Sequence, residues 1–149
     1  MNLSFSTRGW PELSWDDMIQ TALEMGFAGI EVYNLPKFDP MVERGGPFHK
    51  HKIAATVRQL RDLKLTIPCF DTSCDLSSDP ECVSFLQTLL EVAKNARVPY
   101  VCACALQDNE PQVRENLEVL LEEYKEAIGY YKTVEIAGET ISRSDTAVF

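Results

Sequence analysis

The sequence lacks the features that mark membrane and exported proteins. None of its apolar runs reaches the roughly 18 residues that a membrane-spanning helix needs. The first residues also lack the basic, then apolar, then small-residue order of a secretory signal. We therefore expect no membrane partner and predict a cytoplasmic protein.

Basic residues and metal-binding patterns are also scarce. There are 14 Lys and Arg against 23 Asp and Glu, which gives a formal net charge of −9. Such a surface repels a phosphate backbone, so we expect no nucleic-acid partner. The 5 cysteines and 2 histidines contain no C-x-x-C pair and no zinc-site spacing. Without an export signal, the odd number of cysteines predicts reduced thiols.

The remaining composition is that of one folded domain. The chain has 149 residues, of which 45% are apolar and 25% are charged. A chain of this length can bury a hydrophobic core without disulfide bonds or metal ions, so we expect residues 1–149 to form a single domain. Short apolar segments alternate with segments of helical period. The expected strands are 3–6, 29–33, 65–70, 99–105 and 133–137, and the expected helices begin at Ser14, His51, Pro80 and Pro111, with one more at Ser144 or Asp145.

The alternation predicts an α/β fold with a parallel (βα) repeat. The strand centres recur at about 33 residues, and eight such repeats need roughly 260 residues, a typical barrel length. The chain would then be the N-terminal half of a TIM-type barrel, with about four βα units plus strand five. The alternative is an open doubly wound sheet. A G-x-G-x-x-G motif and a phosphate cradle after the first strand are both absent, which disfavours the familiar open-sheet families.

Polar residues gather where the expected strands end. In barrels the chemistry collects at these carboxyl ends. Asp71 and Gln107 lie there, and Glu31 lies within the strand 29–33; all three are candidate substrate-binding residues, because their side chains suit the hydroxyls of a polyol. The alternatives are an ion pair for Glu31 and a turn cap for Asp71. The segment 34–48, rich in Pro and Gly, is long for a connection, so we predict that it is a mobile lid.

Several segments carry a resemblance to a known family. They are the opening LSFST, the pattern A-x-x-x-G-F-x-G-I-E at 22–31, FDTSC at 70–74, ENL at 115–117 and SDTA at 144–147. Together they resemble the xylose isomerase-like barrels, the superfamily of sugar isomerases, epimerases and endonuclease IV-like proteins. The resemblance implies a divalent metal (Mn, Mg or Zn) at the top of the barrel. It also implies a strand-five Glu that binds the metal and moves protons, for which Glu139 is the candidate and Glu135 the alternative.

The resemblance implies a sugar or sugar-phosphate isomerase or epimerase with a small carbohydrate as its substrate. Its chemistry is metal-assisted proton transfer next to a carbonyl. The family's ligands on strands six to eight have no counterpart here, so we expect that this chain alone does not catalyse the reaction. Two other hypotheses remain: a non-catalytic half-barrel that binds a polyol or pairs with a partner half, and an open α/β sheet with an unrelated ligand. A half-barrel leaves open edges, which predicts a homo-oligomer.

Overall fold

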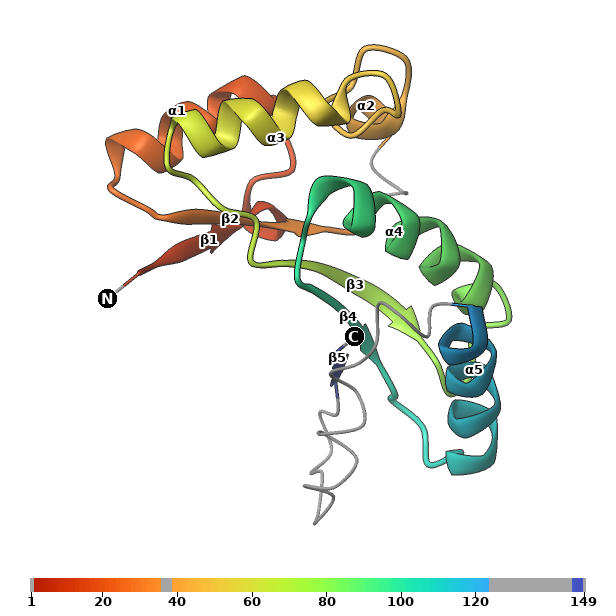
Figure 1. Cartoon of the computed structure of the whole chain (residues 1–149). Coiled ribbons are helices and arrows are strands. Elements are labelled where there is room, and N and C mark those ends of the chain that lie inside the picture. Colours follow the sequence, from red (N-terminus) through yellow and green to blue (C-terminus); the bar gives the residue numbers. More distant parts are fainter. Residues whose placement is uncertain (1, 36–38, 124–145, 149) are drawn as a thin grey trace.

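A computed structural model describes residues 2–35, 39–123 and 146–148. Helices and strands alternate through these ranges (Figure 1). In chain order the elements are β1 (Ser4–Ser6), η1 (Thr7–Gly9), α1 (Trp15–Glu24), β2 (Gly29–Tyr33), α2 (Asp39–Val42), α3 (Ile53–Asp62), β3 (Cys69–Asp75), α4 (Cys82–Ala96), β4 (Tyr100–Cys104), α5 (Glu110–Glu123) and β5 (Thr146–Val148).

The strands form one sheet in sequential order. The order is β1-β2-β3-β4-β5, and the first four strands are parallel. Figure 1 shows α1, α3, α4 and α5 on the same side of the sheet. A doubly wound sheet reverses its strand order and carries helices on both faces. The described part shows neither feature, and its sequential order is that of part of a TIM-type barrel. The predicted α/β class with a parallel repeat is confirmed.

The start and end of α1 follow from local sequence chemistry. Ser14 is the N-cap, and its hydroxyl accepts a hydrogen bond from the backbone N–H of Asp17 at 3.2 Å. The same hydroxyl donates to the Asp17 carboxylate at 2.6 Å. Gly26 follows the helix with φ of 71°, a left-handed conformation that costs glycine little. Both ends were predicted from the sequence.

The core lies between the sheet and the helices. Alternate strand residues such as Ile30, Val32 and Phe70 are fully buried on the helix side. They meet the apolar faces of the helices, including Met18 of α1 and Leu86 of α4. Among the described helices, none is both long enough and apolar enough to cross a bilayer. The buried apolar residues of the strands and helices form one core on this face of the sheet.

The segment 34–48 is anchored in this core at its two ends. Leu35, Met41 and Phe48 are buried. The Phe48 ring packs edge-on against Trp15 of α1 and Phe70 of β3, with centroid distances of 5.2 and 5.5 Å. Residues 36–38 lie outside the described ranges. The predicted mobility of this segment stays a prediction, and the structure adds that its buried side chains hold it to the sheet.

Two predicted elements differ in the structure. The third strand begins at Cys69, four residues later than expected, because Pro68 cannot donate to the ladder; only an isolated bridge joins Thr66 to Gly29 before it. The end of the chain was expected to open a helix, but residues 146–148 form strand β5, antiparallel to β4. An added strand satisfies the backbone groups of the β4 edge, which a terminal helix would leave unpaired. The expected strand 133–137 lies outside the described residues.

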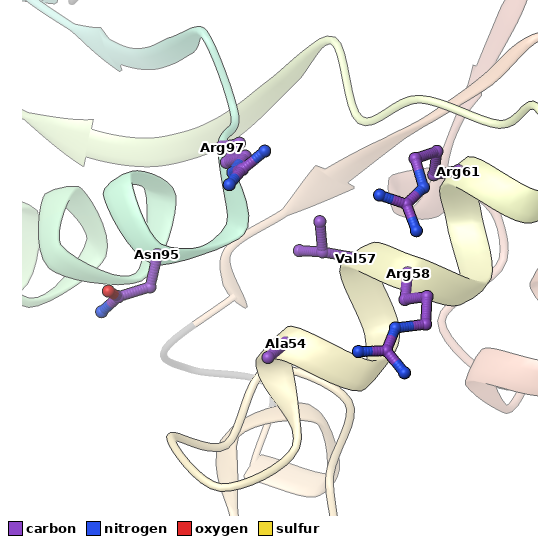
Figure 2. Close-up of a pocket in the computed structure, with 6 residues that line it drawn as sticks. All are labelled: Ala54, Val57, Arg58, Arg61, Asn95 and Arg97. Carbon is purple, nitrogen blue, oxygen red and sulfur yellow. The ribbon is translucent and has the colours of Figure 1, made fainter.

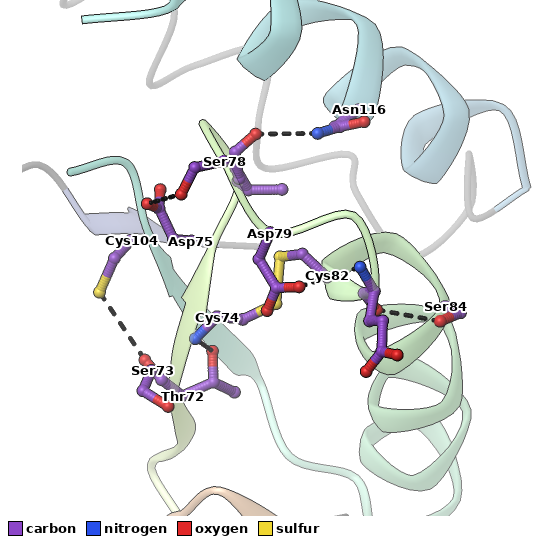
Figure 3. The surroundings of a disulfide bond; sticks show 12 residues. Thr72, Ser73, Cys74, Asp75, Ser78, Asp79, Cys82, Ser84, Cys104 and Asn116 are labelled. Carbon is purple, nitrogen blue, oxygen red and sulfur yellow. Dashed lines mark hydrogen bonds between the residues drawn. A yellow bond between two sulfur atoms is a disulfide. The ribbon is translucent and has the colours of Figure 1, made fainter. Parts of the chain in front are cut away.

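The expectation that all cysteines are reduced is wrong for one pair. Cys74 at the end of β3 and Cys82 at the start of α4 form a disulfide, with their Cα atoms 5.4 Å apart (Figure 3). Both residues are buried. The turn from β3 into α4 returns the chain on itself, which brings together two cysteines that are eight residues apart. Cys69, Cys102 and Cys104 are free thiols.

This pairing predicts the thiol content of the purified protein. Titration with a thiol reagent in denaturant should find 3 thiols per chain before reduction and 5 after it. The double variant Cys74→Ser/Cys82→Ser is the control, and it should give the same count of 3 in both conditions. A count of 5 in the unreduced wild-type protein would contradict the disulfide.

Candidate functional site

Two carboxylates share the face of the sheet that carries no helices in the described part. Glu31 of β2 and Asp71 of β3 alternate with the buried residues of their strands, so both project away from the helices. The register pairs Tyr33 with Asp71, which places Asp71 diagonally across from Glu31 on the neighbouring strand. Both side chains are half-buried. The structure therefore brings two of the three predicted substrate-binding residues together on this open face.

Hydrogen bonds fix the strand ends beside these carboxylates. The Asn34 side chain donates to the Ser73 hydroxyl at 3.0 Å and accepts from the Ser73 backbone N–H at 2.8 Å. Asn34 has φ of 50°, a left-handed conformation that asparagine tolerates better than most residues. The Arg8 guanidinium lies 4.8 Å from the centre of the Tyr33 ring. This end of the sheet thus presents a cation, an amide and hydroxyls next to the carboxylates.

The surroundings of Asp71 disfavour the charged form of its carboxyl group. Burial raises the pKa of its carboxyl group, and the nearby charge of Glu31 raises that pKa further. The Thr72 backbone N–H, 2.9 Å from Oδ1, and the charge of Arg8 act in the opposite direction without cancelling the rise. A carboxyl with a raised pKa is easier to protonate, which suits a group that exchanges protons with a ligand.

Three thiols complete the open face. The Cys69 thiol lies 3.6 Å from a Glu31 carboxylate oxygen. A hydrogen bond with Cys102 raises the pKa of Cys69, and burial and the charge of Glu31 raise it further. Burial and the charges of Asp71 and Asp75 raise the pKa of Cys104. Cys69 and Cys104 are therefore neutral near pH 7 and act as small, weakly polar lining groups.

Asp75 is a structural carboxylate at this end of the sheet that the sequence interpretation missed. It accepts hydrogen bonds from the backbone N–H groups of Ser77 and Leu106, at 2.9 and 3.1 Å, and from the Ser77 hydroxyl. The Ser78 hydroxyl also donates to it (Figure 3). Burial alone would raise its pKa, but the serine and backbone donors outweigh burial and lower it to about 2. The ionised carboxylate thereby ties the loop after β3 to the loop after β4. In the sequence, only the pattern D-x-S-S at 75–78, which is typical of a turn capped by an aspartate, indicates this role of Asp75.

The other predicted site residues are placed differently. Gln107 lies in the loop between β4 and α5, where its backbone N–H donates to the Ser77 hydroxyl at 3.0 Å and the residue is exposed. The loop that contains Asp75 and Ser77 therefore holds the backbone of Gln107 in place. Glu139 and its alternative Glu135 lie outside the described residues, so their roles stay predictions.

The described residues do not fit a metal centre. Within residues 2–35, 39–123 and 146–148, no three His, Cys, Asp or Glu side chains are grouped so that they could hold a metal ion. Glu31 and Asp71 supply two carboxylates, fewer ligands than hard divalent ions take in proteins. The expected metal ligand, Glu139, lies outside these ranges. The metal therefore stays a prediction.

Comparison with known proteins relates the fold to a larger enzyme. No protein-family model and no curated protein matches the chain. Among solved structures, the chain is similar to AsbF of Bacillus anthracis, a probable 3-DHS dehydratase involved in petrobactin synthesis, with a TM-score of 0.62 and 19% sequence identity. The match covers 87% of this chain and 50% of that one, so the chain spans about half the length of that structure. AsbF is a TIM barrel, and the likeness shows that this chain has the fold of part of such a barrel.

Proposed function

We propose that the open face of the sheet binds a small carbohydrate, and that the chain is part of an enzyme that isomerises or epimerises it. The observation that carries this proposal is the position of Glu31 and Asp71, which are diagonal neighbours on two parallel strands, with Asp71 opposite Tyr33 at the carboxyl end of β2. Active sites of barrels form at this end. The likeness to a barrel that is described as a dehydratase supports an enzyme of this general kind.

The polar groups of this face match the hydroxyls of a sugar. The Asn34 amide, the Ser73 hydroxyl and the Arg8 guanidinium supply donors, and the two carboxylates supply acceptors. Asp71, with its raised pKa, is the group best suited to hold a proton or to take one from a ligand. Proton transfer next to a carbonyl needs such a carboxyl, and we assign the second proton-transfer role to Glu139.

Asp71→Asn tests the binding step directly. The substitution keeps the shape and the oxygen that accepts from Thr72, but it removes the charge that faces the ligand. We expect the affinity for D-fructose and D-fructose 6-phosphate, measured by isothermal titration calorimetry, to fall about tenfold, the range of a lost charged hydrogen bond. The thermal midpoint at pH 7 should rise slightly, because the ionised, repelled carboxylate destabilises the fold above its unfolded-state pKa.

Asp62→Asn is the matched control, since Asp62 is exposed at the end of α3. It removes the same charge far from the open face and should leave the affinity for D-fructose unchanged. Equal affinities for Asp71→Asn, Asp62→Asn and the wild-type protein would contradict the proposed carbohydrate site, as would the absence of binding by the wild-type protein at millimolar ligand.

We also propose that the chain forms a homodimer in which two half-barrels face each other, with the carbohydrate site of the open face between them. In the described part, β1 pairs with β2 alone, which leaves an exposed sheet edge. Tyr100 lies on the open face at 36% exposure, and Leu106 beyond β4 is 70% exposed. Light scattering at micromolar concentration should give the mass of two chains, 2 × 16.8 kDa. A monodisperse monomer would contradict this assembly.

A further inference from the structure

A basic cleft lies at the opposite end of the strands from the proposed carbohydrate site. Two adjoining hollows of about 250 and 660 Å³ open between α3 and α4, below the starts of β3 and β4. They share Val57, Arg61 and Arg97. Figure 2 shows Arg58 and Arg61 on α3, Arg97 on the far side of the smaller hollow, and Val57 between them. The larger volume is within the usual range of small-molecule sites.

The charge of this cleft opposes that of the whole chain. Four basic residues line the two hollows, namely Arg58, Arg61, Lys64 and Arg97, and the lining residues include no Asp or Glu. The chain overall has a net charge of −9. Outside the lining, Asp62 lies 3.6 Å from the Arg61 guanidinium, and both side chains are largely exposed. Among the described residues, no carboxylate forms an ion pair with Arg58, Lys64 or Arg97.

Helix ends account for part of this positive charge. α3 and α4 both end beside the cleft, and a helix end carries about half a negative charge that basic side chains offset. Two such ends amount to about one negative charge, and Asp62 adds another. About two positive charges therefore remain uncompensated, enough to favour a multiply charged anion.

The floor of the cleft is apolar. Leu60, Leu65, Ile67, Pro68 and Pro99 line the larger hollow next to the arginines. Guanidinium groups bind phosphate oxygens in pairs, and an apolar floor accommodates the uncharged part of the same molecule. An inorganic phosphate ion would contact only the arginines and would leave the apolar floor exposed to water.

We propose that this cleft binds a phosphorylated small molecule with an apolar body. Arg58, Arg61 and Arg97 hold the phosphate groups, and the apolar body rests on the floor between α3 and the start of β3. The site is separate from the open face that carries Glu31 and Asp71, and it does not depend on the function proposed for that face.

Calorimetric titration with ADP, pyrophosphate and adenosine at constant ionic strength tests the cleft. ADP has both the phosphates and an aromatic base whose faces can pack on the apolar floor, so it should bind more tightly than pyrophosphate, and adenosine should not bind measurably. The double variant Arg58→Gln/Arg97→Gln should weaken ADP binding at least tenfold. Arg44→Gln and Arg44→Gln/Lys50→Gln are controls that remove one and two exposed positive charges outside the cleft, and they should leave ADP binding unchanged.

Two further measurements distinguish ligand binding by the arginines from a purely structural role at the helix ends. Asp71→Asn should keep its ADP affinity, so that failure of the carbohydrate site and failure of the cleft give different results. If the arginine double variant lowers the thermal midpoint but binds ADP like the wild-type protein, the arginines serve only the helix ends and the proposal is wrong. Equal loss of ADP binding in the charge-matched double control, or no binding of ADP by the wild-type protein at millimolar concentration, would also overturn it.

Discussion

Phe70→Ala is expected to lower the free energy of unfolding by about 3–5 kcal/mol, the range for a large aromatic residue removed from a core. Phe70 is fully buried in β3, and its ring packs edge-on against Phe48. The substitution therefore opens a cavity at the point where the segment 34–48 is attached to the sheet. Domains of this size are stable by about 5–15 kcal/mol, so the loss would be a large share of the total. Urea unfolding followed by circular dichroism measures it.

Two substitutions show whether the loss comes from the buried cavity. Phe70→Leu keeps most of the volume and should cost less than about 1.5 kcal/mol. Leu106→Ala removes an apolar side chain that is 70% exposed, and it should change stability by less than about 0.5 kcal/mol. If Phe70→Ala were as mild as Leu106→Ala, the position of Phe70 in the core would be wrong.

The sequence predicted those parts of the fold that local chemistry decides. Ser14 with Asp17 marks the start of α1, and Gly26 its end, because a cap and a left-handed turn need only neighbouring residues. The alternation of strands and helices predicted the parallel sheet, because strands that are connected by helices run in the same direction. The pairing of residues 146–148 with β4 depends on which edge is left free in three dimensions, so a local pattern could not show it.

The candidate site was predictable only in part. Asp71 was expected at the end of a strand, but β3 continues to Asp75, so Asp71 lies within its strand, as Glu31 does. That the two share one face depends on the register between β2 and β3. The disulfide joins Cys74 to Cys82 across a turn whose path the sequence does not reveal. The basic cleft combines residues of α3 with residues beyond α4, which become neighbours only when the two helices pack together.

Asp75→Asn is expected to destabilise the protein by about 3 kcal/mol at pH 7. The ionised carboxylate accepts hydrogen bonds from Ser77, Ser78 and Leu106, and hydrogen bonds to a charged group contribute about 1.5–3 kcal/mol each. An amide can accept at one oxygen only, and its NH₂ group would face donors rather than acceptors. When these hydrogen bonds are lost, the loop before α5 should become more mobile. Faster amide hydrogen exchange at Leu106 and Gln107 would show this. Asp108→Asn, an exposed change in the same loop, should have almost no effect.

The pH dependence separates the charge of Asp75 from its shape. Its pKa is about 2 in the folded protein, below the roughly 3.9 of an unfolded aspartate, so the folded state binds fewer protons in this interval. The stability that Asp75 contributes is therefore fully present above about pH 4 and is lost as the pH falls through 2. The difference in unfolding free energy between the wild-type protein and Asp75→Asn should stay constant from pH 7 to about 4 and shrink below it. A difference that is unchanged down to pH 2 would mean that the serine and backbone donors recognise the shape of the side chain rather than its negative charge.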